Sequence, residues 1–254
     1  MQPLVPKRFF MESQMFKKLT FYTSLMLLIP VFTWAIGWQW QLNSNLIYPE
    51  LDYALFFLTE TGSTPYALIT CVLLMLVVMW LTRQRYSWFL VGFICASSVV
   101  GTQIIKEGAK AVFKEPRPFV TQMFQPNTES FYAKPKATQE ELVLAYTKPE
   151  NQFVVEHQAD ELGYSFPSGH TIFAVSWLLV FAGFLFGLRG QAVVLTQILA
   201  ICWATLMLIS RLRLGMHYPI DLFVSTLIAW GFHLIVFIWV IPYLETWTLF
   251  KKRG

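Results

Sequence analysis

The sequence predicts an all-α integral membrane protein, and three observations lead to that class. Hydrophobic residues make up 56% of the 254-residue chain and charged residues only 13%, which is about half the charged share of a soluble domain. The mean hydropathy is +0.50. The apolar residues are gathered in long runs, and a helix needs about 20 of them to cross the hydrocarbon core of a bilayer. We therefore expect residues 1–254 to form a single membrane domain.

Six apolar runs have the length expected of a transmembrane helix. They lie near residues 19–40, 65–82, 87–105, 170–188, 191–209 and 222–243. The first run is too long for the apolar part of a signal peptide, so we interpret it as an uncleaved anchor. An even number of spans places both termini on the same side of the membrane.

Lysine and arginine near the span ends predict the orientation, because cytoplasmic flanks are rich in both residues. Four lie in the N-terminal tail, and others follow the second, fourth and sixth runs, whereas residues 41–64 contain none. We therefore expect both termini to be cytoplasmic and residues 41–64 to lie on the outer side.

Residues 106–168, between the third and fourth spans, differ in composition from the rest of the chain. Six prolines and many charges predict that this segment is extramembrane and partly helical. Within it, Thr138 to Glu141 matches a capping box, which predicts a short helix over residues 138–146. On the same side of the membrane, the mixed apolar and acidic residues 46–58 suit a helix lying in the interface.

Three polar clusters fall at the outer ends of spans three to six. The first contains Lys110 and Arg117 and is followed by Pro118. Because Pro116 and Pro118 stop a helix and bend the chain, the two cations could point at one spot. The alternative is that both contact lipid headgroups.

The second cluster, Ser168-Gly169-His170, comes directly before an apolar run. Such a helix start leaves backbone N–H groups free at the positive end of the helix dipole, where an anion binds. Glycine lets an anion approach the main chain closely. The alternative is an ordinary N-cap that happens to precede a histidine.

The third cluster runs from Ser210 to Asp221 and includes Arg211 and His217. Pro219 suits the first turn of span six, and His217 and Asp221, four residues apart, can meet across that turn. A carboxylate on one imidazole nitrogen leaves the other as a nucleophile or base. The alternative is a capping aspartate beside a solvated histidine.

Cations, a helix start, two histidines and one carboxylate together suit phosphoryl transfer, where positioning and electrostatics supply most of the catalysis. The motifs contain no acidic cluster able to hold metal ions, so we expect no metal and no other cofactor. The mild net charge of +4 makes nucleic acid a poor candidate partner.

These clusters resemble the type 2 phosphatidic acid phosphatase family. Its pattern is Lys-x6-Arg-Pro, then Pro-Ser-Gly-His, then Ser-Arg-x5-His-x3-Asp, and residues 110–118, 167–170 and 210–221 match every specified position. With its long 106–168 segment, the chain looks like the bacterial phosphatidylglycerophosphatase type.

The resemblance implies that His217 attacks phosphorus to form a phosphohistidine and that Asp221 orients His217. It implies that His170 protonates the leaving oxygen and later activates water. The residues implied to bind the phosphate are Lys110, Arg117, Ser168, Gly169 and Arg211. We expect Arg213 either to support the phosphate-binding residues from behind or to contact a lipid headgroup. We expect solvated side chains for Lys114 and His157, and an interhelical hydrogen bond from His233.

The expected function is a metal-independent lipid phosphatase of the bacterial inner membrane whose site faces the periplasm. The resemblance implies phosphatidylglycerophosphate or undecaprenyl pyrophosphate as substrate, and also phosphatidic acid or diacylglycerol pyrophosphate. Its partners would be the lipid substrate and the bilayer, with no protein partner evident. The alternatives are a phosphotransferase using the same phosphohistidine, an anion transporter, and a haloperoxidase holding vanadate.

Overall fold

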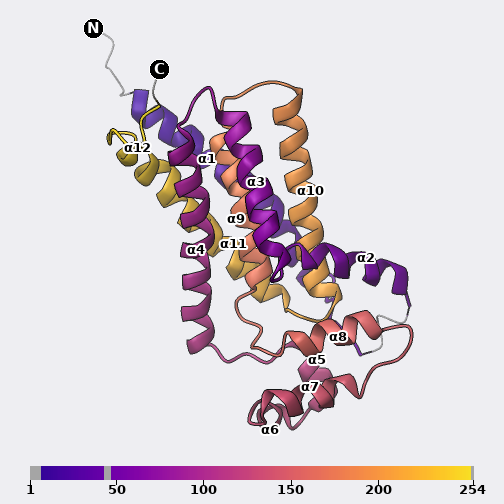
Figure 1. Ribbon diagram of the computed structural model, residues 1–254. Coiled ribbons are helices and arrows are strands. Elements are labelled where there is room, and N and C mark those ends of the chain that lie inside the picture. Colours follow the sequence, from indigo (N-terminus) through magenta and orange to yellow (C-terminus); the bar gives the residue numbers. More distant parts are fainter. Residues whose placement is uncertain (1–6, 43–46, 253–254) are drawn as a thin grey trace.

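A computed structural model describes residues 7–42 and 47–252 of the chain. In these ranges every regular element is a helix (Figure 1). The predicted all-α class is therefore confirmed for the part of the chain that the structure describes.

The apolar runs form the long helices. Four of these are long and apolar enough to cross a membrane. They are α1 (Lys7–Ala35), α4 (Trp88–Val112), α10 (Gln191–Arg213), and α11 (Pro219–Ile235) continued by the π-helix η2 (Val236–Val240) and α12 (Ile241–Leu244). The other two apolar helices, α3 (Tyr66–Thr82) and α9 (Gly169–Phe184), are shorter. Each predicted span thus contains one apolar helix, and four of the six have the length of a full span.

The ends of the helices differ from the predicted boundaries. α1 stops at Ala35, before the predicted end at residue 40, whereas α4 continues to Val112 and α10 to Arg213. Residues 106–112, expected outside the membrane helices, therefore belong to α4. Its helix persists because the first proline after it is Pro116, and the chain becomes extended at Phe113.

Helix α9 is the centre of the bundle. It packs against α1, α4, α10 and α11, and every residue from Thr171 to Phe184 is buried. A helix that is hydrophobic on all sides is stable only when it is surrounded by other apolar groups. By contrast, α3, α4 and α10 expose large apolar side chains such as Leu68, Phe89 and Leu195. These outward faces are suited to lipid.

The segment after α4 forms a cap with four short helices: α5 (Pro118–Phe124), α6 (Thr128–Tyr132), α7 (Lys136–Leu144) and α8 (Gln152–Asp160). They surround a small core of their own, which includes Phe119, Phe131, Val143 and Val155. The predicted capping box is wrong: α7 begins after Pro135, and no side chain caps it. Gln139 turns inward instead and donates to the Lys134 carbonyl at 2.7 Å.

The cap lies at the end of the bundle opposite α12 (Figure 1). Between the cap and the bundle runs α2 (Pro49–Glu60), the helix predicted near 46–58, which packs on α8 and α10. Arg213 holds α2 in place, because its guanidinium lies 2.8 and 3.0 Å from the two carboxylate oxygens of Asp52. Arg213 therefore links α10 to α2 through this ion pair.

Candidate active site

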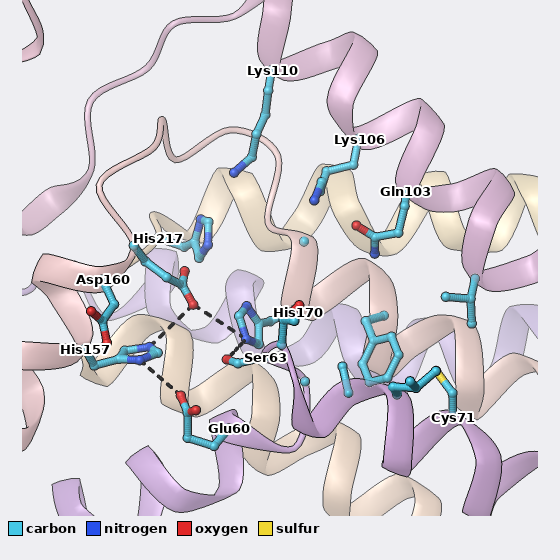
Figure 2. A pocket seen from close by; sticks show the side chains of 18 of the residues that line it. Glu60, Ser63, Cys71, Gln103, Lys106, Lys110, His157, Asp160, His170 and His217 are labelled. Atoms are coloured by element: carbon cyan, nitrogen blue, oxygen red, sulfur yellow. Dashed lines mark hydrogen bonds and ion pairs between the residues drawn. The ribbon is translucent and has the colours of Figure 1, made fainter. Parts of the chain in front are cut away.

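A cavity of about 640 Å³ opens between the bundle and the cap. Figure 2 shows Lys110 and Lys106 reaching into it from α4, with His217, His170 and His157 on the other walls. Five of the eight predicted site residues line this cavity: Lys110, Arg117, Gly169, His170 and His217. The three motifs, far apart in the chain, therefore meet at one place.

His217 and Asp221 form the pair that their spacing predicted. The His217 Nδ1 lies 3.3 Å from Asp221 Oδ2, and the Tyr218 backbone N–H donates to the same oxygen at 2.9 Å. Both side chains are buried. When Nδ1–H donates to this oxygen, Nε2 keeps its lone pair.

The turn before α11 sets the position of His217. Gly215 has φ +71°, and a Cβ there would lie 2.6 Å from the Trp40 ring, so only glycine fits. The backbone N–H groups of Met216 and His217 both donate to the Arg211 carbonyl at 3.1 Å. The close turn brings His217 back over the end of α10.

The surroundings of His217 keep its imidazole neutral. Burial lowers the pKa of His217, and the positive charges of Arg117, Arg211 and Lys110 lower it further, well below the usual 6.5. A nucleophilic nitrogen needs a free lone pair. The electrostatics therefore favour the reactive form of His217 at neutral pH.

Arg117 is held at the N-terminus of α5 by the neighbouring backbone. Its Nε donates to the Gly163 carbonyl at 2.6 Å and its Nη1 to the Met216 carbonyl at 3.3 Å. The side chain is 3% exposed and lines the cavity. The headgroup alternative does not fit such a buried arginine.

The start of α9 is built as predicted. Ser168 is the N-cap, and its hydroxyl accepts from the Thr171 backbone N–H at 3.3 Å. Gly169 lines the cavity, while Ser168 is fully buried behind it. The Ser168 hydroxyl is thus engaged in capping.

His170, the second residue of α9, is positioned by the turn that follows α2. The His170 Nε2 lies 3.0 Å from the Ser63 hydroxyl. A Cβ on Gly62 would lie 2.8 Å from the His170 ring, so this turn can approach the ring only with glycine at position 62. Neither Gly62 nor Ser63 carries a motif that marks it in the sequence.

Glu161 is the principal residue that the motifs missed. Its Oε2 lies 2.8 Å from Arg211 Nη2 and 3.3 Å from Arg117 Nη2, and its Oε1 lies 3.7 Å from His170 Nε2. Burial raises the pKa of Glu161, but Arg211, His170, Arg117 and His157 outweigh burial and hold it well below the usual 4.5. Glu161 is therefore an ionised carboxylate at the centre of the cations.

His157 is not solvated as expected. It is 3% exposed, with Nε2 lying 3.0 Å from Arg211 Nη1 and Nδ1 lying 3.3 Å from Glu60. The expectation failed because nothing in the local sequence shows that α8 folds back against α2. The only available signal was the four-residue spacing of His157 and Glu161 on one helix face.

The remaining expected residues lie behind the cavity wall or away from it. Asp221 is behind His217, and Arg211 is fully buried, with Thr59 accepting from its Nη1 at 2.8 Å. The expected interhelical bond of His233 is not found among the described residues; its Nδ1 lies 2.7 Å from the Ala229 carbonyl of its own helix. Lys114 is exposed, as expected. Among the described residues, no group of three or more metal-ligating side chains could hold a metal ion.

Comparison with known proteins shows the family of the chain. Residues 87–243 match the PAP2 superfamily model. The chain is 46% identical over 231 residues to a phosphatidylglycerophosphatase B of Haemophilus influenzae, which covers 88% of this chain and 95% of that protein. It is 38% identical over 215 residues to the proteins of that name from Escherichia coli K12 and Shigella flexneri, with 82% of each chain covered. The chain belongs to the PAP2 superfamily and is a phosphatase.

Proposed function

We propose that this phosphatase removes the terminal phosphate of a membrane lipid through a phosphohistidine on His217. The observation that carries the proposal is the His217–Asp221 pair, whose neutral imidazole faces a cavity walled by Lys110, Arg117 and His170. An anionic phosphate would be neutralised there without a metal ion.

The reaction would proceed in two steps. The Nε2 of His217 attacks phosphorus while the bond from phosphorus to the leaving oxygen breaks, and His170 gives that oxygen its proton. His170 then takes a proton from water, whose oxygen attacks the phosphohistidine and releases inorganic phosphate and free His217. Lys110, Arg117, Arg211 and the start of α9 at Ser168 and Gly169 would hold the non-bridging oxygens.

The substrates we propose are phosphatidylglycerophosphate and undecaprenyl pyrophosphate. The first is supported by the names of the relatives, and the second by the family resemblance of the motifs. Phosphatidic acid and diacylglycerol pyrophosphate share the same terminal group. All four present a terminal phosphate while their chains remain in lipid.

We further propose that all six apolar helices of the 1–254 domain span the inner membrane. The shorter helices, α3 and α9, are about 24–26 Å long, and α9 can be short because longer helices surround it. Lysine and arginine near the span ends support cytoplasmic termini, with the cap and cavity on the periplasmic side.

The activity is tested by measuring phosphate release from the purified protein in detergent with excess EDTA. Phosphatidylglycerophosphate and undecaprenyl pyrophosphate are compared side by side, and His217→Ala is the blank. We expect release from at least one lipid, absent in the variant. Phosphate found on a lipid or glycan acceptor instead of in solution would indicate the phosphotransferase alternative.

The orientation is tested with Thr147→Cys, on the exposed end of the cap, in a chain whose three native cysteines are replaced. An impermeant thiol reagent should label it in intact spheroplasts. The control, Gln84→Cys between α3 and α4, should be labelled only after lysis. The opposite pattern would contradict the proposed orientation.

A further inference from the structure

Glu161 occupies the place that the proposed mechanism gives to the phosphate of the substrate. Its carboxylate lies between Arg211 Nη2 at 2.8 Å and Arg117 Nη2 at 3.3 Å, with His170 Nε2 at 3.7 Å. Guanidinium groups bind carboxylate and phosphate oxygens in the same way. The chain thus supplies its own anion to the residues proposed to bind the phosphate.

Glu161 lines the cavity, and Arg211 lies behind it. Its side chain is fully buried, and it is not among the residues that line the cavity, whereas Glu161 lines the cavity and is 24% exposed. The other end of the guanidinium, Nη1, is held by Thr59 and His157. A phosphate that binds Arg211 through Nη2 therefore competes with Glu161 for this group.

We propose that Glu161 is a specificity-determining residue, an internal anion that makes the pocket select doubly charged terminal phosphates over singly charged phosphodiesters. The inference rests on the proposed phosphate site. A diester replaces one negative charge by another, so the exchange gains little Coulomb energy from the surrounding cations. A terminal phosphate carries a charge of about −1.5 to −2 at pH 7. Its negative charge exceeds that of the Glu161 carboxylate, so the exchange gains Coulomb energy from the cations.

This selection matters for an enzyme that faces a bilayer. Ordinary phospholipid headgroups are diesters, and they surround the cavity at far higher concentration than any phosphomonoester. Lys106 and Lys110, which reach into the same cavity (Figure 2), attract both kinds of group. The Glu161 carboxylate prevents diester headgroups from occupying the pocket.

Glu161 has a neighbour other than the two arginines. Its Oε1 lies 3.7 Å from His170 Nε2, so a carboxylate that moves away from Arg117 and Arg211 can remain beside His170. There it would stabilise the protonated form of that ring, the proposed acid.

The test measures anion binding without turnover, through the thermal unfolding midpoint of the full chain in detergent at pH 7.5. Orthophosphate serves as the doubly charged probe and dimethyl phosphate as the singly charged one. In the native chain we expect orthophosphate to stabilise at concentrations where dimethyl phosphate does not. In Glu161→Gln both should stabilise, and the ratio of their dissociation constants should fall at least about tenfold, equivalent to about 1.4 kcal/mol.

The matched control is Glu156→Gln, the same substitution at an exposed position of α8, which should keep the native selectivity. An unchanged ratio in Glu161→Gln overturns the inference and leaves the phosphatase proposal standing. Failure of orthophosphate to stabilise any of these proteins contradicts the phosphate site itself.

A second variant covers the case in which Glu161→Gln does not fold, because Arg117 and Arg211 lose their shared anion. Glu161→Asp keeps the charge but shortens the side chain by one methylene, which weakens its hold on Arg211. We expect a selectivity between those of the native chain and of a chain without the carboxylate. Native selectivity in this variant would contradict the inference.

Discussion

The two histidines of the site are held by different kinds of surroundings. The partner of His217 is Asp221, four residues later in the chain, which the Tyr218 backbone also holds. The partners of His170, Ser63 and Glu161, come from the turn after α2 and from the cap. One histidine thus has a fixed local partner, whereas the partners of the other come from two separate parts of the chain.

In the proposed mechanism this difference separates two tasks. A nucleophile needs one protonation state and one orientation, which a carboxylate on the same helix turn provides. The surroundings of His170 include Glu161, which is shared with Arg117, Arg211 and His157. We therefore expect changes near His217 to reduce the chemical step and changes near His170 to alter binding, protonation and selectivity.

The largest effect should follow from His217→Ala. Removal of the nucleophile should lower kcat by at least about 10⁴-fold, because the other site residues cannot form the covalent intermediate. Phosphate release from a defined lipid measures the change. If the variant keeps more than a small residual activity, in protein free of other phosphatases, the mechanism is disproved.

Asp221→Asn should have the second-largest effect on kcat. The amide has nearly the same shape but no charge, so it can stabilise the wrong tautomer of His217, and we expect kcat to fall about 10³-fold. The same assay applies, with the unfolding midpoint as a check that the site is intact. A loss confined to KM would contradict the orienting role.

Arg117→Gln should show the electrostatic control of His217. The native pKa of His217 lies well below 6.5, so kcat/KM should stay high as the pH falls through 6.5 and decline only below it. Without Arg117 the pKa rises, and the acid limb should move to higher pH, while kcat/KM falls about 100-fold. An unmoved acid limb would show that this charge does not act on His217.

Ser63→Ala should have a smaller effect. It removes the hydrogen bond to His170, which contributes about 0.5–1.5 kcal/mol, so we expect kcat to fall about three- to tenfold. The acid limb of the kcat/KM profile, which we assign to His217, should stay in place. If the acid limb moves, Ser63 affects His217 and not His170.

Arg213→Ala should have the smallest effect on turnover. Arg213 pairs with Asp52 and does not line the cavity, so most of the activity should remain. The buried Asp52 would lose a charged partner, which should cost about 2 kcal/mol and lower the unfolding midpoint. A large loss of kcat with an unchanged midpoint would place Arg213 in the chemistry.

The sequence predicted the region around His217 well. Contacts there are local: Asp221 comes four residues after His217, and Pro219, between them, marks the start of the helix that carries Asp221. The start of α9 at Gly169 was likewise readable from its cap residue and the apolar run that follows. In each case helix geometry converts a spacing directly into a distance.

The region around His170 was predicted only in part. Ser63 is separated from His170 by 107 residues, and no periodicity links a turn after an interfacial helix to the start of α9. His157 was expected to be solvated because a polar segment ordinarily faces water. The cap helices, however, build a second small core that carries α8 against α2 and buries His157.

By itself, the sequence determined the membrane class, the six apolar helices and the identity of the histidines and cations, because hydrophobic run length and helix spacing are local properties of the chain. Only the tertiary structure decided what surrounds those cations. Glu161 joins Arg117 and Arg211 because the cap folds back over the bundle. The positive charges of the two arginines favour a nearby carboxylate. Which carboxylate comes near depends on contacts between distant parts of the chain, and no local sequence pattern predicts them.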